Sequence, residues 1–230
     1  KPVATPSNPK ANNKPADLSA LSSVLVDGKV NIGSMVYDQY RVSGLNVGIK
    51  ADGQKLALNG LNVKVDDSQI KGNFAISQFS KPLYTFDIDV DQVNLDKYAS
   101  ASSTPKTKQD ADKPLDLSAL KALNAQGSIR VGRLTYGKTK ASNINIKLMA
   151  DGEKLNLNPL SVKVDDSQIH GSFGIAQFSK PNFLFNLNID KLDADQYIAK
   201  GEPTAKSSGD TPIDLSALKK LNATGEAKIG

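Results

Sequence analysis

The residues of this chain that could do chemistry are mainly carboxylates. Asp66 and Asp67 form a pair, and Asp165 and Asp166 repeat that pair 99 positions further on. A calcium loop would need several more oxygen ligands at set spacing, and none follows either pair. A polar β-turn is therefore the better interpretation of both pairs.

Three more carboxylates alternate along one stretch, at Asp87, Asp89 and Asp91. Alternate residues of a strand share a face, so these side chains could form a ladder that binds cations. The equivalent positions further along the chain hold Asn186, Asn188 and Asp190. Neutral amides would weaken a cation site, and this pattern favours a solvated outer face.

The other side chains give no catalytic arrangement. His170 is the only histidine, and with no cysteine in the chain it cannot build a zinc site. The sequence contains no nucleophile elbow, no phosphate-binding glycine loop and no pair of nucleophile and base. We therefore expect a protein that is not an enzyme and needs no cofactor or metal.

The composition excludes further classes of protein. Zero Cys rules out a disulfide framework. The net charge of +5 is mild and the lysines are scattered, while aromatic residues make up only 6% of the chain. A nucleic-acid interface would combine a basic face with interleaved aromatic side chains, so we expect no nucleic-acid partner.

The elements that position these side chains are organised as an internal repeat. Residues 17–98 align without gaps with residues 116–197, and roughly 38 of the 82 pairs are identical. A third copy starts at residue 213, where the sequence DLSAL recurs. Polar segments rich in Pro, Ser, Thr and Lys precede each copy, and we interpret them as linkers. The predicted organisation is a linker at 1–16, unit 1 at 17–98, a linker at 99–115, unit 2 at 116–198, a linker at 199–212 and a truncated third unit at 213–230.

Each unit has the pattern of five short strands. In unit 1 alternation and turn residues predict strands at 28–37, 40–51, 55–65, 69–78 and 83–94. Leu58 to Leu61 breaks the alternation, so Gly60, or Pro159 in unit 2, predicts a bulge. Short helical turns are expected after Asp17 and Asp116, and again at 95–98 and 193–197. We predict an all-β fold of five-stranded antiparallel units that form a curved sheet, either a half-barrel or a groove, with polar crossover linkers.

One face of every expected strand is apolar, and it changes little between the copies. Ile70, Gly72, Phe74 and Ile76 keep their identity in unit 2, whereas the alternate positions drift among small polar residues. No long amphipathic helix is available to cover this face. The candidate residues of an apolar, lipid-binding lining are Val30, Ile32, Leu45, Val47, Ile49, Leu56, Leu58, Val63, Val65, Ile70, Phe74, Ile76, Phe86, Ile88, Val90, Ile129, Val131, Ile144, Ile146, Leu148, Leu155, Leu157, Val162, Val164, Ile169, Phe173, Ile175, Phe183, Phe185, Leu187 and Ile189.

The end of each unit resembles the AsmA family. The skeleton F…P…F…D.L..D.Y falls on Phe178, Pro181, Phe185, Asp190, Leu192, Asp195 and Tyr197. In unit 1 it falls on Phe79, Pro82, Phe86, Asp91, Val93, Asp96 and Tyr98. The run L.A.DG.L.L.PL, also typical of the family, begins at Leu148 and ends at Leu160. The resemblance covers nearly all of the chain outside the linkers.

The resemblance implies a function as well as a fold. AsmA-like proteins of Gram-negative bacteria are similar to bridge-like lipid-transfer proteins, project into the periplasm from one inner-membrane helix and are implicated in outer-membrane biogenesis. It therefore implies a periplasmic β-groove tethered to the inner membrane, with phospholipid or another acyl lipid as partner and envelope proteins as further partners. The chain opens in a linker-like segment without Met and stops at Gly230 in an expected strand. We accordingly expect a fragment of a longer protein that lacks the anchor.

Two other functions compete with the groove. A structural spacer of the cell envelope would have the same strands closed around a dry apolar core, which is what most apolar strand faces form. A surface adhesin built from repeats would bind through its loops, but the copies agree most in the lining and its turns. Lipid identity, the direction of transfer and the question of whether both units share one sheet stay open at this point.

Overall fold

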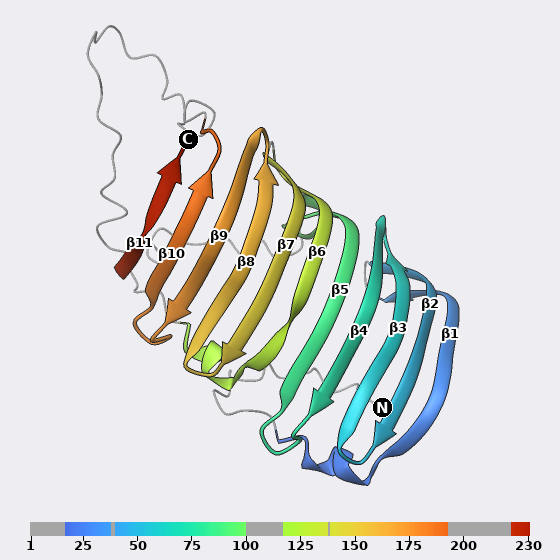
Figure 1. The fold of residues 1–230 in the computed structure, drawn as a ribbon. Helices are drawn as coiled ribbons and strands as arrows, with labels where there is room; N and C mark the ends of the chain where they lie inside the picture. The colour runs from blue at the N-terminus through green and yellow to red at the C-terminus, as the bar shows by residue number, and fades with distance from the viewer. Residues whose placement is uncertain (1–16, 38–39, 100–116, 138, 193–221) are drawn as a thin grey trace, which may run out of the picture.

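A single open sheet of eleven strands dominates the structure (Figure 1). The computed structural model describes residues 17–37, 40–99, 117–137, 139–192 and 222–230. The strands lie side by side in the order of the sequence, from β1 at one end to β11 at the other. The predicted all-β class and the open, curved sheet are therefore confirmed.

Unit 1 contributes five strands, each close to its predicted bounds. They are β1 (Leu25–Tyr37), β2 (Tyr40–Asp52), β3 (Lys55–Val65), β4 (Ser68–Ser77) and β5 (Leu83–Asn94). A 3-10 turn, η1 (Ser19–Ser23), precedes them, and a single helical turn, α1 (Asp96–Ala99), follows them. Alternating β-branched and aromatic residues, bounded by Asp, Gly and Pro turns, explain these strands.

Unit 2 repeats the same order of elements. It consists of η4 (Ser118–Ala122), β6 (Asn124–Tyr136), β7 (Thr139–Asp151), β8 (Lys154–Val164), β9 (Ser167–Ala176) and β10 (Asn182–Ile189). The strand β11 (Asn222–Ile229) belongs to the third copy. The turn expected at 193–197 and the DLSAL segment of the third copy lie outside the described residues, as do 1–16 and most of the two later linkers.

The units meet at parallel joints. Within a unit every neighbouring pair of strands is antiparallel, whereas β5 pairs with β6 and β10 pairs with β11 in parallel. Parallel neighbours need a connection that returns along the whole strand, which explains a long linker after every fifth strand. Units 1 and 2 thus share one continuous sheet.

The predicted bulge lies in the third strand of both units. The register between β3 and β4 shifts between Leu58 and Leu61, and that between β8 and β9 shifts between Leu157 and Leu160. In β3 the backbone N–H of Gly60 donates to the side-chain oxygen of Asn73 at 2.9 Å. The extra residue of each bulge keeps leucines on the same face on both sides of the kink.

The best-buried large side chains lie at one margin of the sheet, beneath the 3-10 turns. Phe178 is 1% exposed and Phe79 is 7% exposed. Each phenylalanine follows the fourth strand of its unit, and its carbonyl accepts a hydrogen bond of 2.8 Å from Leu117 or Leu18 respectively. Asp17 accepts a hydrogen bond of 2.9 Å from the Ser19 N–H, although Leu18 occupies the N-cap position of η1. We call this edge the capped margin.

Candidate functional site

The candidate lining residues come together on one face of the sheet. Strand register connects Phe74 with Phe86, Leu157 with Phe173, and Phe173 with Phe185. Across the joint it connects Ile88 with Ile129 and Val90 with Val131. We call the side of the sheet that carries these pairs the apolar face, and the opposite side the polar face.

The apolar face consists of four rows that run across all strands. The row through the phenylalanines, which we call the phenylalanine row, contains Gly28, Ile49, Leu58, Phe74, Phe86, Gly127, Leu148, Leu157, Phe173, Phe185 and Gly225. The next two rows begin at Val30 and at Ile32, and the row nearest the capped margin begins at Val26. Val65 and Val164 lie beyond the rows, where they pair with Val42 and Ala141. No charged residue stands in any of the rows within the described strands.

Several lining residues were missing from the sequence-based set. Leu61 and Leu160 belong to it because the bulges return them to the apolar face. Tyr84 pairs with Ile76 and therefore also lies there. Ala223, Gly225, Ala227 and Ile229 of β11 extend the rows into the third copy. The bulge itself was the signal for the leucines, while the register of β11 could not be read from the sequence.

The large side chains of the apolar face remain accessible. Phe74, Phe86, Phe173 and Phe185 are all partly exposed, unlike the buried phenylalanines at the capped margin. Only small or β-branched members such as Val47, Ala125 and Ala150 fall below one tenth exposure. Within the described residues, no second layer of secondary structure covers this face.

The size of the apolar face is unusual for a monomer. Four rows two residues apart span about 20 Å, and eleven strands span about 48 Å. The resulting area is on the order of 1,000 Å², whereas the largest apolar patch of a typical soluble monomer is about 300–600 Å². Larger patches mark binding surfaces for lipid, membrane or protein.

Glycines shape the sheet beneath these rows. Gly72 and Gly171 have φ values of 150° and 149°, and a Cβ there would lie 2.1 Å and 1.9 Å from a backbone oxygen of the next strand. At the joints, the Phe86 ring lies over Gly127 and the Phe185 ring over Gly225, where a Cβ would be 2.5 Å and 2.7 Å from ring atoms. These positions accept glycine alone because the neighbouring strand or ring occupies the space of a side chain.

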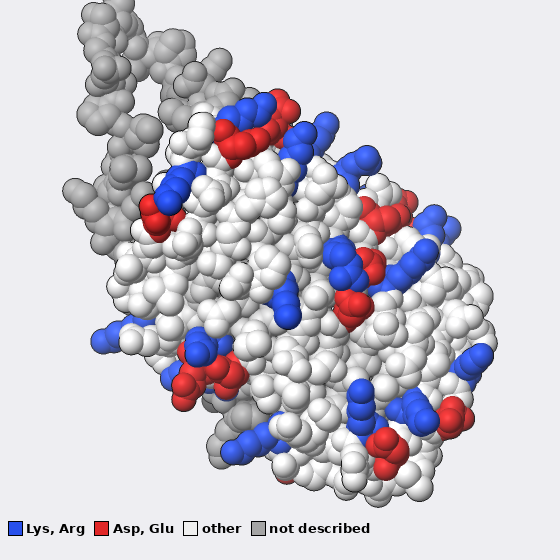
Figure 2. All heavy atoms as spheres, in the orientation of Figure 1, with Lys and Arg blue, Asp and Glu red and all other residues white. Residues whose placement is uncertain are grey.

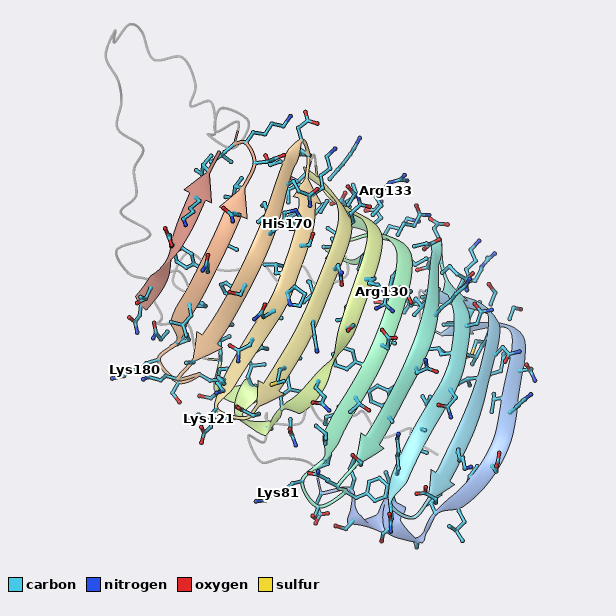
Figure 3. The ribbon with its side chains drawn as sticks, viewed as in Figure 1. Lys81, Lys121, Arg130, Arg133, His170 and Lys180 are labelled. Carbon is cyan, nitrogen blue, oxygen red and sulfur yellow. The ribbon has the colours of Figure 1, made fainter. Side chains whose placement is uncertain are left out.

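The polar face carries an ion-pair cluster at the first joint. Arg130 of β6 contacts Asp87 at 2.6 Å and Asp89 at 2.5 Å, both from β5. Figure 3 labels Arg130 near the middle of the sheet, and Figure 2 shows basic and acidic atoms together at this place. The hydrogen bond from Arg130 lowers the pKa of Asp89, and both carboxylates raise the pKa of the Arg130 guanidinium further. Asp87 and Asp89 are thus paired across the joint as well as exposed, and the sequence-based interpretation missed Arg130.

The remaining carboxylates of interest close turns. The Asp66 carboxylate accepts the Arg41 N–H at 2.9 Å, and the equivalent Asp165 accepts the Lys140 N–H at 3.1 Å. Asp67 pairs with Lys97. Asp91 accepts the Gln69 N–H at 2.7 Å, the same contact that Asp190 makes with Gln168.

Backbone donors lower the pKa of two turn carboxylates, those of Asp52 and Asp190. Hydrogen bonds from the N–H groups of Gln54 and Lys55 lower the pKa of Asp52. The Gln168 N–H likewise lowers the pKa of Asp190. These groups stabilise turns and strand ends, and their geometry assigns them no catalytic contact.

Two open hollows lie on the polar face. They have volumes of about 560 Å³ and 480 Å³ and share Lys147 and Met149 in their walls. Small residues such as Gly174 and Ala75 create the space. Apart from this region, Figure 2 shows the charged side chains mainly along the two margins of the sheet.

Other kinds of site find no support in the part of the chain that the structure describes. His170 lies exposed on the polar face, at the position equivalent to exposed Lys71. No group of three or more His, Asp or Glu side chains is placed to hold a metal ion among these residues. None of the described helical segments is long and apolar enough to cross a bilayer.

Comparison with known proteins gives no match: no protein family, no curated protein and no solved structure matches this chain. The resemblance to the AsmA family therefore stays a prediction.

Proposed function

We propose that the apolar face binds acyl chains of phospholipids and lets them move along its rows. The observation that carries this proposal is a face of apolar residues that crosses eleven strands without a charged residue in its rows, and whose large side chains are partly exposed. A bound acyl chain gains about 0.8 kcal/mol for each methylene removed from water. A lining of this kind needs no catalytic group.

Passive movement follows from the repetition of the lining. Equivalent apolar side chains recur at each strand, about 4.8 Å apart. A lipid leaving a membrane exchanges one apolar environment for another, so binding holds it without trapping it. Many weak, equivalent contacts then give shallow minima along the sheet.

The lipid head group would bind at the capped margin of the sheet. Lys81, Lys121 and Lys180 lie along the capped margin (Figure 3). Lys121 donates to the Ser179 hydroxyl at 2.7 Å. Basic and hydroxyl groups suit the phosphate of a lipid whose tails lie on the apolar face.

The proposed setting is the periplasm of a Gram-negative bacterium, with a tether to the inner membrane and a role in outer-membrane biogenesis. The similarity to AsmA motifs supports this setting. The competing function, a spacer with a dry core, would bury the lining phenylalanines. Their partial exposure favours the groove.

Native mass spectrometry with lipid extraction tests the proposal on the chain purified without detergent. We expect phospholipid to copurify with the wild-type chain and to be absent from the double variant Phe74→Asp, Phe173→Asp. Asn73→Asp with Ser172→Asp is the matched control, because it adds the same charges to the polar face. A chain that carries no lipid and rejects added phospholipid would contradict the proposal and favour the spacer.

A further inference from the structure

The free edge of β1 has the features of a joint that is not filled. β1, β6 and β11 are the first strands of their copies, and β6 and β11 each take a parallel fifth strand on the side away from their own unit. Within the described residues β1 pairs with β2 alone. The other edge of β1 therefore corresponds to the edge of β6 that pairs with β5.

Two glycines five residues apart mark this surface on all three first strands. On β6 they are Gly127 and Gly132, whose Cβ atoms would lie 2.1 Å from the Phe86 oxygen and 2.5 Å from the Asp91 oxygen. On the third copy they are Gly225, which faces Phe185, and Gly230 directly after β11, where a Cβ would lie 3.5 Å from the Asp190 oxygen. The fifth strands therefore meet the glycines with a phenylalanine and, five residues later, an aspartate.

β1 carries the same pair of glycines without the partner. Gly28 and Gly33 have the same spacing, and a Cβ at either would meet no atom within 4 Å. Gly28 pairs with Ile49 in the phenylalanine row, as Gly127 pairs with Leu148. Glycine weakens a strand unless a backbone or ring approaches closely, and nothing described approaches these two.

The edge strand is also long and carries exposed apolar side chains near both ends. β1 has 13 residues, and Leu25 and Val36 are 78% and 71% exposed. The unpaired N–H and C=O groups of a long exposed edge are a template for pairing with another strand. The fifth strands in the structure, β5 and β10, already have a neighbour on each side. A second copy of this chain therefore has no fifth strand to give without breaking a joint.

We propose that the free edge of β1 receives, in parallel, the fifth strand of a further repeat unit, with a phenylalanine over Gly28 and an aspartate at Gly33. The docked strand continues the apolar face into the further unit and forms a third joint of the kind seen twice. This inference concerns strand pairing and does not rest on the lipid proposal.

The test extends the full chain at its N-terminus with the sequence of residues 82–99, placed directly before Lys1 so that residues 1–16 act as the linker. Amide hydrogen exchange of β1 is the readout. We expect at least about tenfold slower exchange at the outward amides of β1 and no change at β11. The same extension with its phenylalanine at the position of Phe86 replaced by alanine is the control and should protect β1 less.

A double variant tests the glycine positions, and exchange elsewhere in the sheet shows whether the variant chain is still folded. Gly28→Val with Gly33→Val in the extended chain should abolish the protection, while exchange within β6–β10 stays unchanged, because both sites have open space for a side chain. Protection that survives these substitutions, or its absence in the extended chain, would overturn the proposal. Slow exchange that appears in the unextended chain and rises with its concentration would also overturn it, since a second copy would then be the occupant.

Discussion

The two joints of the sheet have the same apolar face and different polar faces. At the first joint Arg130 lies between Asp87 and Asp89, whereas at the second joint the equivalent positions hold Lys228, Asn186 and Asn188. Lys228 contacts Glu226 of its own strand at 3.6 Å instead. In both joints a phenylalanine ring covers a glycine. Ring-over-glycine packing is therefore the constant part of a joint, and the ion pairs are variable.

The two bulges show the same division between constant and variable parts. In unit 1 Gly60 donates its N–H to Asn73. In unit 2 Pro159 has no N–H to donate, and Ser172 replaces the asparagine. Both bulges nevertheless return a leucine to the apolar face. The lining geometry is kept while the polar contacts that support it change together.

The largest expected effect concerns the strand-contact glycines. Gly171→Val should lower the free energy of unfolding by about 3 kcal/mol or more, because φ is 149° and the Cβ would overlap the Asn186 oxygen. Gly28→Val, at a glycine with open space around it, should change stability by no more than about 0.5 kcal/mol. Urea denaturation of both variants provides the measurement, and equal losses would refute the role assigned to Gly171.

A second test separates core from lining. Phe178→Ala should cost about 3–5 kcal/mol, since this side chain is 1% exposed. Phe173→Ala should cost about 1–2 kcal/mol, because part of its ring already faces solvent. Thermal or urea unfolding measures both, and a Phe173 loss as large as that of Phe178 would mean an ordinary closed core.

The contrast between the joints predicts a smaller effect. Arg130→Met should destabilise the chain by about 1 kcal/mol, because the ion pairs are exposed. Lys228→Met should stay within about 0.5 kcal/mol, since no carboxylate of β10 lies opposite. The difference should shrink in high salt, where exposed pairs are screened. Equal effects at low salt would show that the two joints do not differ in this way.

The smallest effect is the pH dependence of the Arg130 cluster. The pKa of Asp89 is lower in the folded chain than in the unfolded chain, so its contribution is complete above about pH 4 and disappears as pH falls through the folded pKa. The stability gap between wild type and Arg130→Met should therefore narrow as the pH falls below about 4 and close once the pH is below the folded pKa of Asp89. If the stability difference between wild type and Arg130→Met stays constant from neutral to acidic pH, the loss comes from packing of the arginine stem and not from the ion pairs.

The sequence predicted the strands well because their signals are local. The bounds of β3 and β5 agree fully with the prediction, since Asp, Gly and Pro turns flank them. The bulge at Gly60 followed from a single break in alternation. The lining candidates fell into rows because alternation fixes the face of each strand independently of its neighbours.

Contacts between units were beyond the sequence. At each joint, the paired strands are separated in the sequence by a polar linker. The sequence of the linker does not indicate which residues of the two strands lie opposite each other. The Arg130 cluster was missed for this reason, as Arg130 lies more than 40 residues from its partners. The glycine pairs at 28 and 33, 127 and 132, and 225 and 230 were visible in the sequence, but their meaning required the structure.

Site-specific photo-crosslinking tests the central claim most directly. A photoreactive residue is placed in turn at positions 144 to 148 of β7, and each chain is incubated with phospholipid vesicles, irradiated and analysed for lipid adducts. The account predicts adducts at 144, 146 and 148, on the apolar face, and few or none at 145 and 147. Equal adducts at all five positions, or adducts only at 145 and 147, would contradict an apolar face that carries lipid.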